Sequence, residues 1–255
     1  MLGLGSLPML AQTPQTDLPQ LSSLVDGKTI IKTDPFNDIL GHLNLKVERL
    51  ITRGASAQLS LEFSPDGATE KQSGAFHTNP FFMSNSFVFS PEQPRYIAAS
   101  PQIRCYLNGG MGHGFYMEAY YRAQHSEFSH QRMYVHHHMV GSETNFFDVR
   151  YNGSATMHSF GINIGAQWLF GRRKNIVLDW HILGVGRGFT RGSLTGTYTP
   201  AVSHAEVEKA LRQDIPRDMT DAVFTFDTTQ PQVKVSKIKQ ASDIFDMGVS
   251  IGFRF

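Results

Sequence analysis

The chain has 255 residues, which suits one domain, and its net charge of +1 with 18 % charged residues excludes the basic surface that nucleic-acid binding needs. Its one cysteine, Cys105, excludes an internal disulfide and a cysteine-based zinc site. No apolar run reaches the roughly 20 residues of a membrane-spanning helix, but a closed β-barrel needs only about 9–11 residues in each strand to cross a membrane.

The N-terminal segment is typical of an exported protein. Residues 1–11 (MLGLGSLPMLA) are uncharged and end in a small residue, like the apolar core and cleavage site of a secretory signal. Residues 12–26 are polar and contain Pro14 and Pro19, which predicts an unstructured linker. We therefore expect a signal-peptide remnant over residues 1–11, a linker over 12–26 and one β-domain over 27–255.

The β-domain contains eight stretches in which apolar and polar residues alternate, the pattern of a strand with one apolar face. The last stretch is the clearest, because its odd positions from Phe245 to Phe255 are apolar and its even positions from Asp246 to Arg254 are small or polar. In the stretch before it, Ile182 continues the apolar face and His181 lies on the polar face. The eight predicted strands cover residues 27–36, 42–51, 55–64, 95–107, 114–124, 159–170, 175–188 and 245–255.

The connections between these strands alternate in length. Short turns at residues 52–54, 108–113 and 171–174 alternate with longer connections at 37–41, 65–94, 126–158 and 189–241. This alternation predicts an eight-stranded antiparallel up-and-down transmembrane β-barrel with short periplasmic turns and long extracellular loops.

The long loops themselves contain ordered segments. Ser203 and Glu206 form a capping box, which predicts one short helix over residues 203–213. Residues 133–140 and 145–151 predict a hairpin that continues two strands beyond the membrane, and residues 224–237 predict a similar extension.

A soluble lipocalin-like barrel would have the same alternation with its apolar face inward. Three features favour the membrane barrel. The polar face is rich in small residues such as Gly161 and Gly248 and has few charges, unlike a soluble surface. Aromatic residues also lie near strand ends, where a membrane barrel has its interfacial girdle: Phe63, Phe115, Trp168, Phe170, Phe253 and Phe255.

The lumen of an eight-stranded barrel is filled by its own side chains. Symmetric pairing about the short turns places Arg104 opposite Glu118 and brings Gln167 close to Asp179. Because an unpaired buried charge is very costly, we expect these charges to form a structural plug instead of an open channel. The predicted lumenal polar network consists of Lys32, Lys46, Glu48, Glu62, Arg104, Glu118, Arg122, Asp179, Asp246 and Arg254.

Two groups of residues are candidates for metal binding or for catalysis. His136 and His138 would share a strand face as metal ligands could, but no third ligand lies at a useful spacing. Ser159, next to His158, and His181, near Asp179, suggest a hydrolase site on the wall, but neighbouring strand residues point to opposite faces. We therefore assign no catalytic, cofactor-binding or metal residue.

The loop over residues 79–89 is unusually aromatic, and exposed apolar patches often mark binding sites. Self-packing over the barrel mouth is the alternative interpretation. The candidate residues for interaction are Phe81, Phe82, Phe87 and Phe89.

Five segments resemble a family of Bacteroidetes outer-membrane β-barrels of unknown function, within the wider OmpA/OmpX-like set. These segments are TDP at residues 33–35, VER at 47–49, RCYL at 104–107, GFYM at 114–117 and the stretch 160–188. The resemblance covers most of residues 27–255 and implies an eight-stranded barrel in the cell envelope. In such proteins a terminal aromatic residue like Phe255 is the signal read by the barrel-assembly machinery.

These patterns together predict a non-enzymatic outer-membrane protein without a cofactor, which acts in envelope structure or surface interaction through its extracellular loops. Two alternatives remain, namely transport or binding of a small, hydrophobic molecule, and an outer-membrane lipid hydrolase. The expected partners are outer-membrane lipid, the barrel-assembly machinery and an extracellular partner of the loops.

Overall fold

The computed structural model describes residues 27–35, 42–65, 88–89, 95–108, 110–138, 144–198, 203–205, 207–209, 222–227 and 229–255, with side chains except at 88–89 and 130–148. The predicted signal-peptide remnant and linker lie outside the described residues, as do Phe81 and Phe82. Phe87 is also outside them, and Phe89 is described by its backbone alone.

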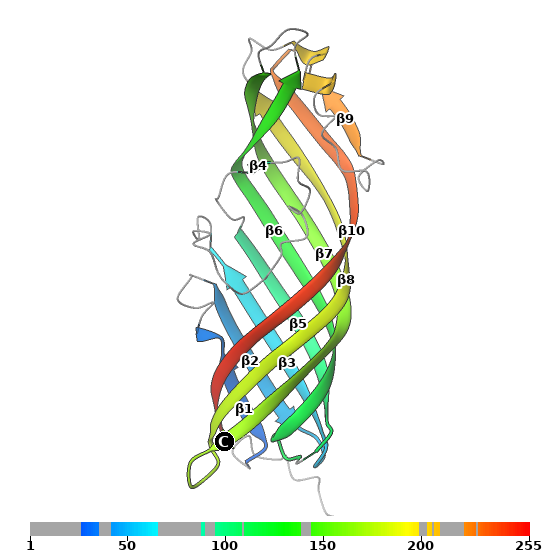
Figure 1. The fold of residues 1–255 in the computed structure, drawn as a ribbon. Helices are drawn as coiled ribbons and strands as arrows, with labels where there is room; N and C mark the ends of the chain where they lie inside the picture. Colours follow the sequence, from blue (N-terminus) through cyan, green and yellow to red (C-terminus); the bar gives the residue numbers. More distant parts are fainter. Residues whose placement is uncertain are drawn as a thin grey trace, which may run out of the picture.

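Eight antiparallel strands form a closed ring in the order β1-β2-β3-β5-β6-β7-β8-β10 (Figure 1). The ring closes between its first and last members, where Ile31 pairs with Phe253 and Thr33 with Ile251. A two-residue strand, β4, pairs with β6, and β9 pairs with β10 outside the ring. The strands are β1 (Thr29–Thr33), β2 (Leu43–Leu50), β3 (Ala55–Ser64), β4 (Val88–Phe89), β5 (Arg95–Tyr106), β6 (Gly114–His138), β7 (Thr144–Phe170), β8 (Ile176–Tyr198), β9 (Val223–Phe226) and β10 (Gln232–Arg254).

The eight predicted strands are confirmed as the members of this ring, but four of them are longer than predicted. The connections expected at residues 126–158 and 189–241 are strand over much of their length, because β6, β7, β8 and β10 continue past the ends of their neighbours. The hairpin predicted near residues 133–151 is confirmed as a continuation of β6 and β7. Near residues 224–237, the start of β10 pairs with the separate strand β9. Helical residues at 204–205 and 207–209 agree with the start of the predicted short helix.

The assignment of Ile182 to the outward face was wrong, because β8 has a bulge there. Ile164 pairs with Leu183, whereas the next residue of β7, Gly165, pairs with His181, so Ile182 is an extra residue in β8. A bulge shifts the alternation by one position. Beyond it, Leu183 and Val185 are therefore the exposed residues of β8.

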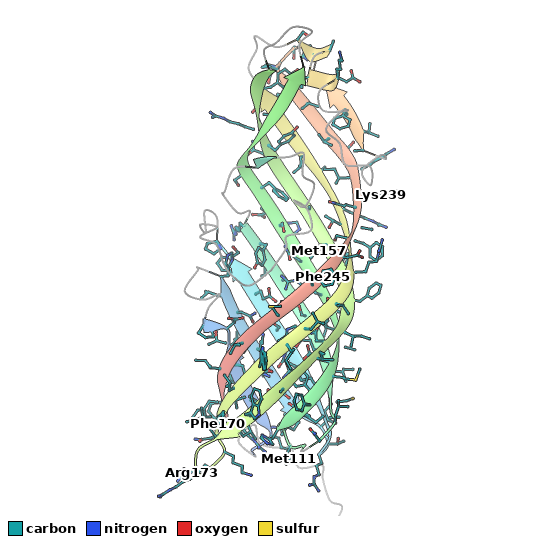
Figure 2. All side chains as sticks on the ribbon, in the orientation of Figure 1. Met111, Met157, Phe170, Arg173, Lys239 and Phe245 are labelled. Carbon is teal, nitrogen blue, oxygen red and sulfur yellow. The ribbon has the colours of Figure 1, made fainter. Side chains whose placement is uncertain are left out.

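The outward face of the ring is apolar. On β10, Phe245, Met247 and Phe253 are 57 %, 43 % and 43 % exposed, while Ser250 between them is buried, which confirms the predicted alternation. In Figure 2, Phe170 and Met111 lie near the end of the molecule that carries the short turns, and Phe245 lies near its middle. The large apolar side chains exposed on the ring include Ile31, Leu43, Leu45, Val47, Leu59, Leu61, Phe63, Ile97, Ile103, Phe115, Met117, Tyr121, Phe160, Ile162, Ile164, Phe170, Ile176, Trp180, Leu183, Val185, Phe189, Phe245, Met247, Ile251 and Phe253.

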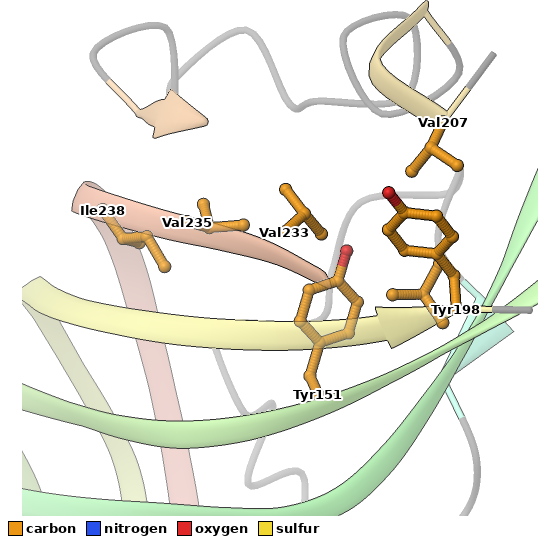
Figure 3. Close-up of a cluster of buried hydrophobic side chains, with 7 residues drawn as sticks. Tyr151, Tyr198, Val207, Val233, Val235 and Ile238 are labelled. Atoms are coloured by element: carbon orange, nitrogen blue, oxygen red, sulfur yellow. The ribbon is translucent and has the colours of Figure 1, made fainter. Parts of the chain in front are cut away.

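Beyond the ring, the polarity of the two faces is reversed. We call residues 128–138, 144–154, 193–198 and 232–237 the extension, because β5 pairs with β6 only as far as Glu127. Val149, Tyr151, Tyr198, Val233 and Val235 are buried there and form one apolar cluster with Val207 of the short helix (Figure 3). Its other face carries Arg150, Asn152, Ser193, Thr195, Thr197, Lys234 and Lys237. The extension is therefore built like one side of a water-soluble β-sheet protein, with its apolar residues inside.

No helix among the described residues is long and apolar enough to cross a membrane.

Candidate functional site

The residues of the predicted lumenal network all lie on the inward face of the ring, but they form separate groups. Five of them join Gln167 in a group that we call the interior cluster, which consists of Lys32, Glu48, Arg104, Glu118, Gln167 and Asp179. Glu62 and Arg122 form a second pair. Lys46 bonds to Ser250, and Asp246 lies beside His181. Arg254 bonds to the backbone at the end of the ring.

Lys32 crosses the interior of the ring from β1. Its Nζ lies 2.8 Å from Glu48 Oε2 on the neighbouring strand. The same atom donates to Gln167 Oε1 on β7 at 2.8 Å and to Asp179 Oδ2 on β8 at 2.6 Å. All three N–H groups of the ammonium therefore donate a hydrogen bond, and this one side chain connects β1 with β2, β7 and β8.

Arg104 joins the same acceptors from the opposite wall. Its Nη1 donates to Asp179 Oδ2 at 2.7 Å and to Gln167 Oε1 at 3.1 Å. Its Nε donates to Glu118, the residue directly opposite it on β6, in agreement with the predicted pairing. The guanidinium also lies 4.1 Å from the centre of the Tyr116 ring, a cation–π contact.

Hydroxyl groups and one side-chain amide donate to the remaining carboxylate oxygens. Tyr106 and Ser56 donate to Glu48 Oε1 at 2.5 and 2.6 Å. Tyr116 donates to Asp179 Oδ1 at 2.7 Å, and Asn163 Nδ2 donates to Glu118 Oε1 at 2.7 Å. Each carboxylate of the interior cluster thus has a partner on both oxygens, which is what burial of a charge requires.

The interior cluster is buried and fills the ring at its level. All six residues are at most 3 % exposed. Its formal charges are those of two cations, Lys32 and Arg104, and three carboxylates, so they nearly cancel. Water or an ion would have to displace several charge-assisted hydrogen bonds to pass the cluster.

The turn between β5 and β6 covers the end of the ring below the interior cluster. Met111 N donates to Arg53 O at 2.6 Å, and Gln167 Nε2 donates to Gly112 O at 2.9 Å. Arg254 Nη1 donates to Met111 O at 3.1 Å. The turn between β5 and β6 is therefore bonded to the interior cluster, to β10 and to the turn between β2 and β3, and it covers this end of the ring.

On the other side of the interior cluster, the ring contains a polar cavity of about 140 Å³. Arg122 Nη1 donates to Glu62 Oε1 at 2.7 Å on its wall. His181 Nδ1 lies 3.4 Å from Asp246 Oδ2, while His181 Nε2 has no hydrogen-bond partner among the described residues. The volume and the polar lining suit a few water molecules.

The two residues considered for hydrolysis do not meet. Ser159 pairs with Gly188, whereas His181 pairs with Gly165, six residues further along β7. At about 3.3 Å per residue this is a separation of about 20 Å, and nucleophile and base need hydrogen-bond contact. Among the residues with described side chains, no group of three or more histidine, cysteine or acidic residues could hold a metal. The side chains of His136 and His138 lie outside that set.

Glycine on the inward face makes room for the tyrosines of this site. Gly165 pairs with Tyr116, and a methyl group there would lie 2.3 Å from Tyr116 Oη and 2.6 Å from Trp180 O. Tyr116 is 1 % exposed and cannot move away without losing its bond to Asp179.

We expect the substitution Gly165→Ala to lower the free energy of unfolding by about 1–3 kcal/mol, the usual cost of overpacking. The matched control is Gly248→Ala, where the nearest atom to the new methyl group is Asp34 Oδ2 at an ordinary 3.4 Å. This variant should be unchanged or more stable by about 0.4–1 kcal/mol. Urea unfolding of the refolded proteins in lipid vesicles measures both, and equal stabilities would contradict the steric account.

The hydroxyl donors to the interior cluster were not predicted as members of the site. Alternation had already placed Tyr106 and Tyr116 on the polar face, and that was the only signal in the sequence. The contact of Asp246 with His181 was also missed, because it depends on the bulge at Ile182.

Comparison of the chain with family models, with curated proteins and with solved structures gives no match. The resemblance to Bacteroidetes outer-membrane barrels therefore stays a prediction.

Proposed function

We propose that the chain is a non-enzymatic outer-membrane β-barrel protein, whose ring crosses the membrane and whose extension and loops serve envelope structure or surface interaction. The observation that supports this most is the reversal of polarity between the ring and the extension. Soluble proteins rarely expose a continuous apolar surface of more than a few hundred Å². A ring that is apolar outside and charged inside suits lipid, where closed strands leave no unpaired backbone.

Charged residues at both ends of the apolar face support the same proposal. At the short turns, Arg53, Arg172, Arg173 and Lys174 are exposed. In Figure 2, Arg173 points away from the ring at one end, and Lys239 lies beyond Phe245 toward the other end. Such residues are favourable at the level of lipid headgroups.

The interior cluster supports a function outside the interior of the ring. Because the ring is blocked and its cavity is small, transport of a molecule along its axis is disfavoured, and the separation of Ser159 from His181 disfavours hydrolysis at those residues. We therefore place the function at the extension and at the loop with Phe81, Phe82, Phe87 and Phe89. Phe255 is proposed as the signal for the barrel-assembly machinery.

Cell fractionation with a heat-modifiability test examines this proposal. The expressed chain should be found in the outer-membrane fraction, and its mobility in a detergent gel should differ before and after boiling, since a closed ring resists unfolding by the detergent at low temperature. A soluble periplasmic protein with one mobility would overturn the proposal.

A further inference from the structure

An apolar groove of about 680 Å³ lies on the outward face of the ring, near its junction with the extension. Its sides are large residues of β2, β3 and β5, of which Leu45, Phe63 and Ile97 are exposed. Its floor is made by Ala99 and Ala123, which pair directly across β5 and β6. The groove exists because these two side chains are small while those on the neighbouring strands are large.

Groups that can bind an anion lie at the upper end of this groove. His125 and Thr156 line it there, joined by a contact of 3.1 Å between His125 Nδ1 and Thr156 Oγ1. Arg95 is the next outward residue of β5 after Ile97, and its guanidinium lies 5.9 Å from the centre of the Phe63 ring. The distance of 3.9 Å between Arg95 Nη1 and Glu127 Oε2 is too long for a hydrogen bond, and both side chains are more than half exposed.

An apolar groove with a guanidinium beside one of its lining residues, Phe63, complements an amphiphile with an anionic head. We propose that the groove binds one acyl chain of an anionic lipid, whose phosphate lies at Arg95 and His125. The size is within the usual range for a ligand pocket. This inference rests on the proposed function, because it assumes that the apolar face of the ring meets lipid.

Native mass spectrometry of the full chain in a non-ionic detergent tests the proposal with two lipids of identical chains, dimyristoyl phosphatidylglycerol and dimyristoyl phosphatidylcholine. We expect one bound lipid per chain and a preference of about fivefold for the anionic one, the effect of about one favourable cation near its headgroup. Arg95→Gln should abolish this preference. Arg187→Gln, which changes an exposed arginine paired with Asp243 elsewhere on the ring, should leave it unchanged.

The chain offers a matched pair of variants for the groove itself. Ala123→Phe fills the floor and should reduce bound lipid to the detergent background. Ala119→Phe adds the same ring to the same face of β6, outside the groove, and should retain lipid like the wild type. Heat-modifiability of each variant shows that it has folded.

Equal lipid retention by the two heat-modifiable variants would overturn this inference and leave the membrane barrel standing. A wild-type chain that is neither heat-modifiable nor found in the outer-membrane fraction would instead overturn the proposed function. If Ala123→Phe abolishes a dimer of the chain with no lipid bound, the groove belongs to a second copy and the lipid proposal is wrong.

Discussion

Replacing Lys32 by methionine should lower the free energy of unfolding by about 3–5 kcal/mol, the usual cost of removing one partner from a buried ion pair. The ammonium is the only group that donates to Glu48, Gln167 and Asp179 together in the described part of the ring. Without it, Arg104 would face three buried carboxylates alone. Urea unfolding in lipid vesicles, followed by the fluorescence of the two tryptophans, measures the change.

Lys28→Met is the matched control, because this lysine precedes the same strand and is exposed. Its loss should change stability by less than about 1 kcal/mol. A second variant, Lys32→Met with Glu48→Gln, removes one carboxylate charge but keeps the oxygen that accepts from Tyr106 and Ser56. We expect this double variant to be more stable than Lys32→Met alone, because it no longer leaves the Glu48 charge without its cation. The double-mutant cycle measures this coupling between the two residues. If Lys32→Met is as stable as Lys28→Met, the interior cluster does not hold the ring together.

Ile162→Arg should destabilise the protein in lipid vesicles by about 2–4 kcal/mol, the cost of an arginine on the lipid-facing side at mid-membrane depth. Ile162 is 52 % exposed and lies midway along β7 between Phe170 at the short turns and Ser154 in the extension. Its outward neighbours on the two adjacent strands are Ala119 and Val185, so the new charge would have no polar contact beside it.

Ser193→Arg is the control for this substitution. Ser193 is exposed on β8 within the extension, where the outward residues are already polar, and the change should cost no more than about 1 kcal/mol. Unfolding of both variants by urea in the same vesicles gives the comparison. If the two arginines cost the same, the ring does not lie in the bilayer, and the proposed membrane location is wrong.

The predictions from sequence that succeeded concern relations between residues close together in the chain. Alternation assigned the outward residues from Phe245 to Phe253 correctly, because successive side chains of a strand point to opposite faces. The pairing of Arg104 with Glu118 followed from the length of one short turn. In a hairpin, turn length sets the register, so both relations can be found from a few residues of sequence.

The predictions that failed concern features without a local signal. A bulge adds one residue without changing composition, so the apolar pair Ile182 and Leu183 fits a regular strand equally well. The end of β8 was placed too early and the start of β10 too late, because the apolar residues change there from the outer to the inner face, as Val233 and Val235 show. Apolar and polar residues still alternate in the extension, but the alternation alone does not indicate which of the two faces points inward.

The sequence by itself determined where the eight strands of the ring lie and, away from the bulge, which side chains share a face, since the faces are set by the two-residue period of the backbone. Only the tertiary structure decided that Lys32 reaches Asp179 and Gln167 across the ring, and that Ala99 and Ala123 lie at the floor of a groove. These contacts join residues from non-neighbouring strands or depend on the sizes of side chains on four strands at once. Closure of the ring brings these residues together, and no pattern within a short stretch of sequence indicates that they are close in space.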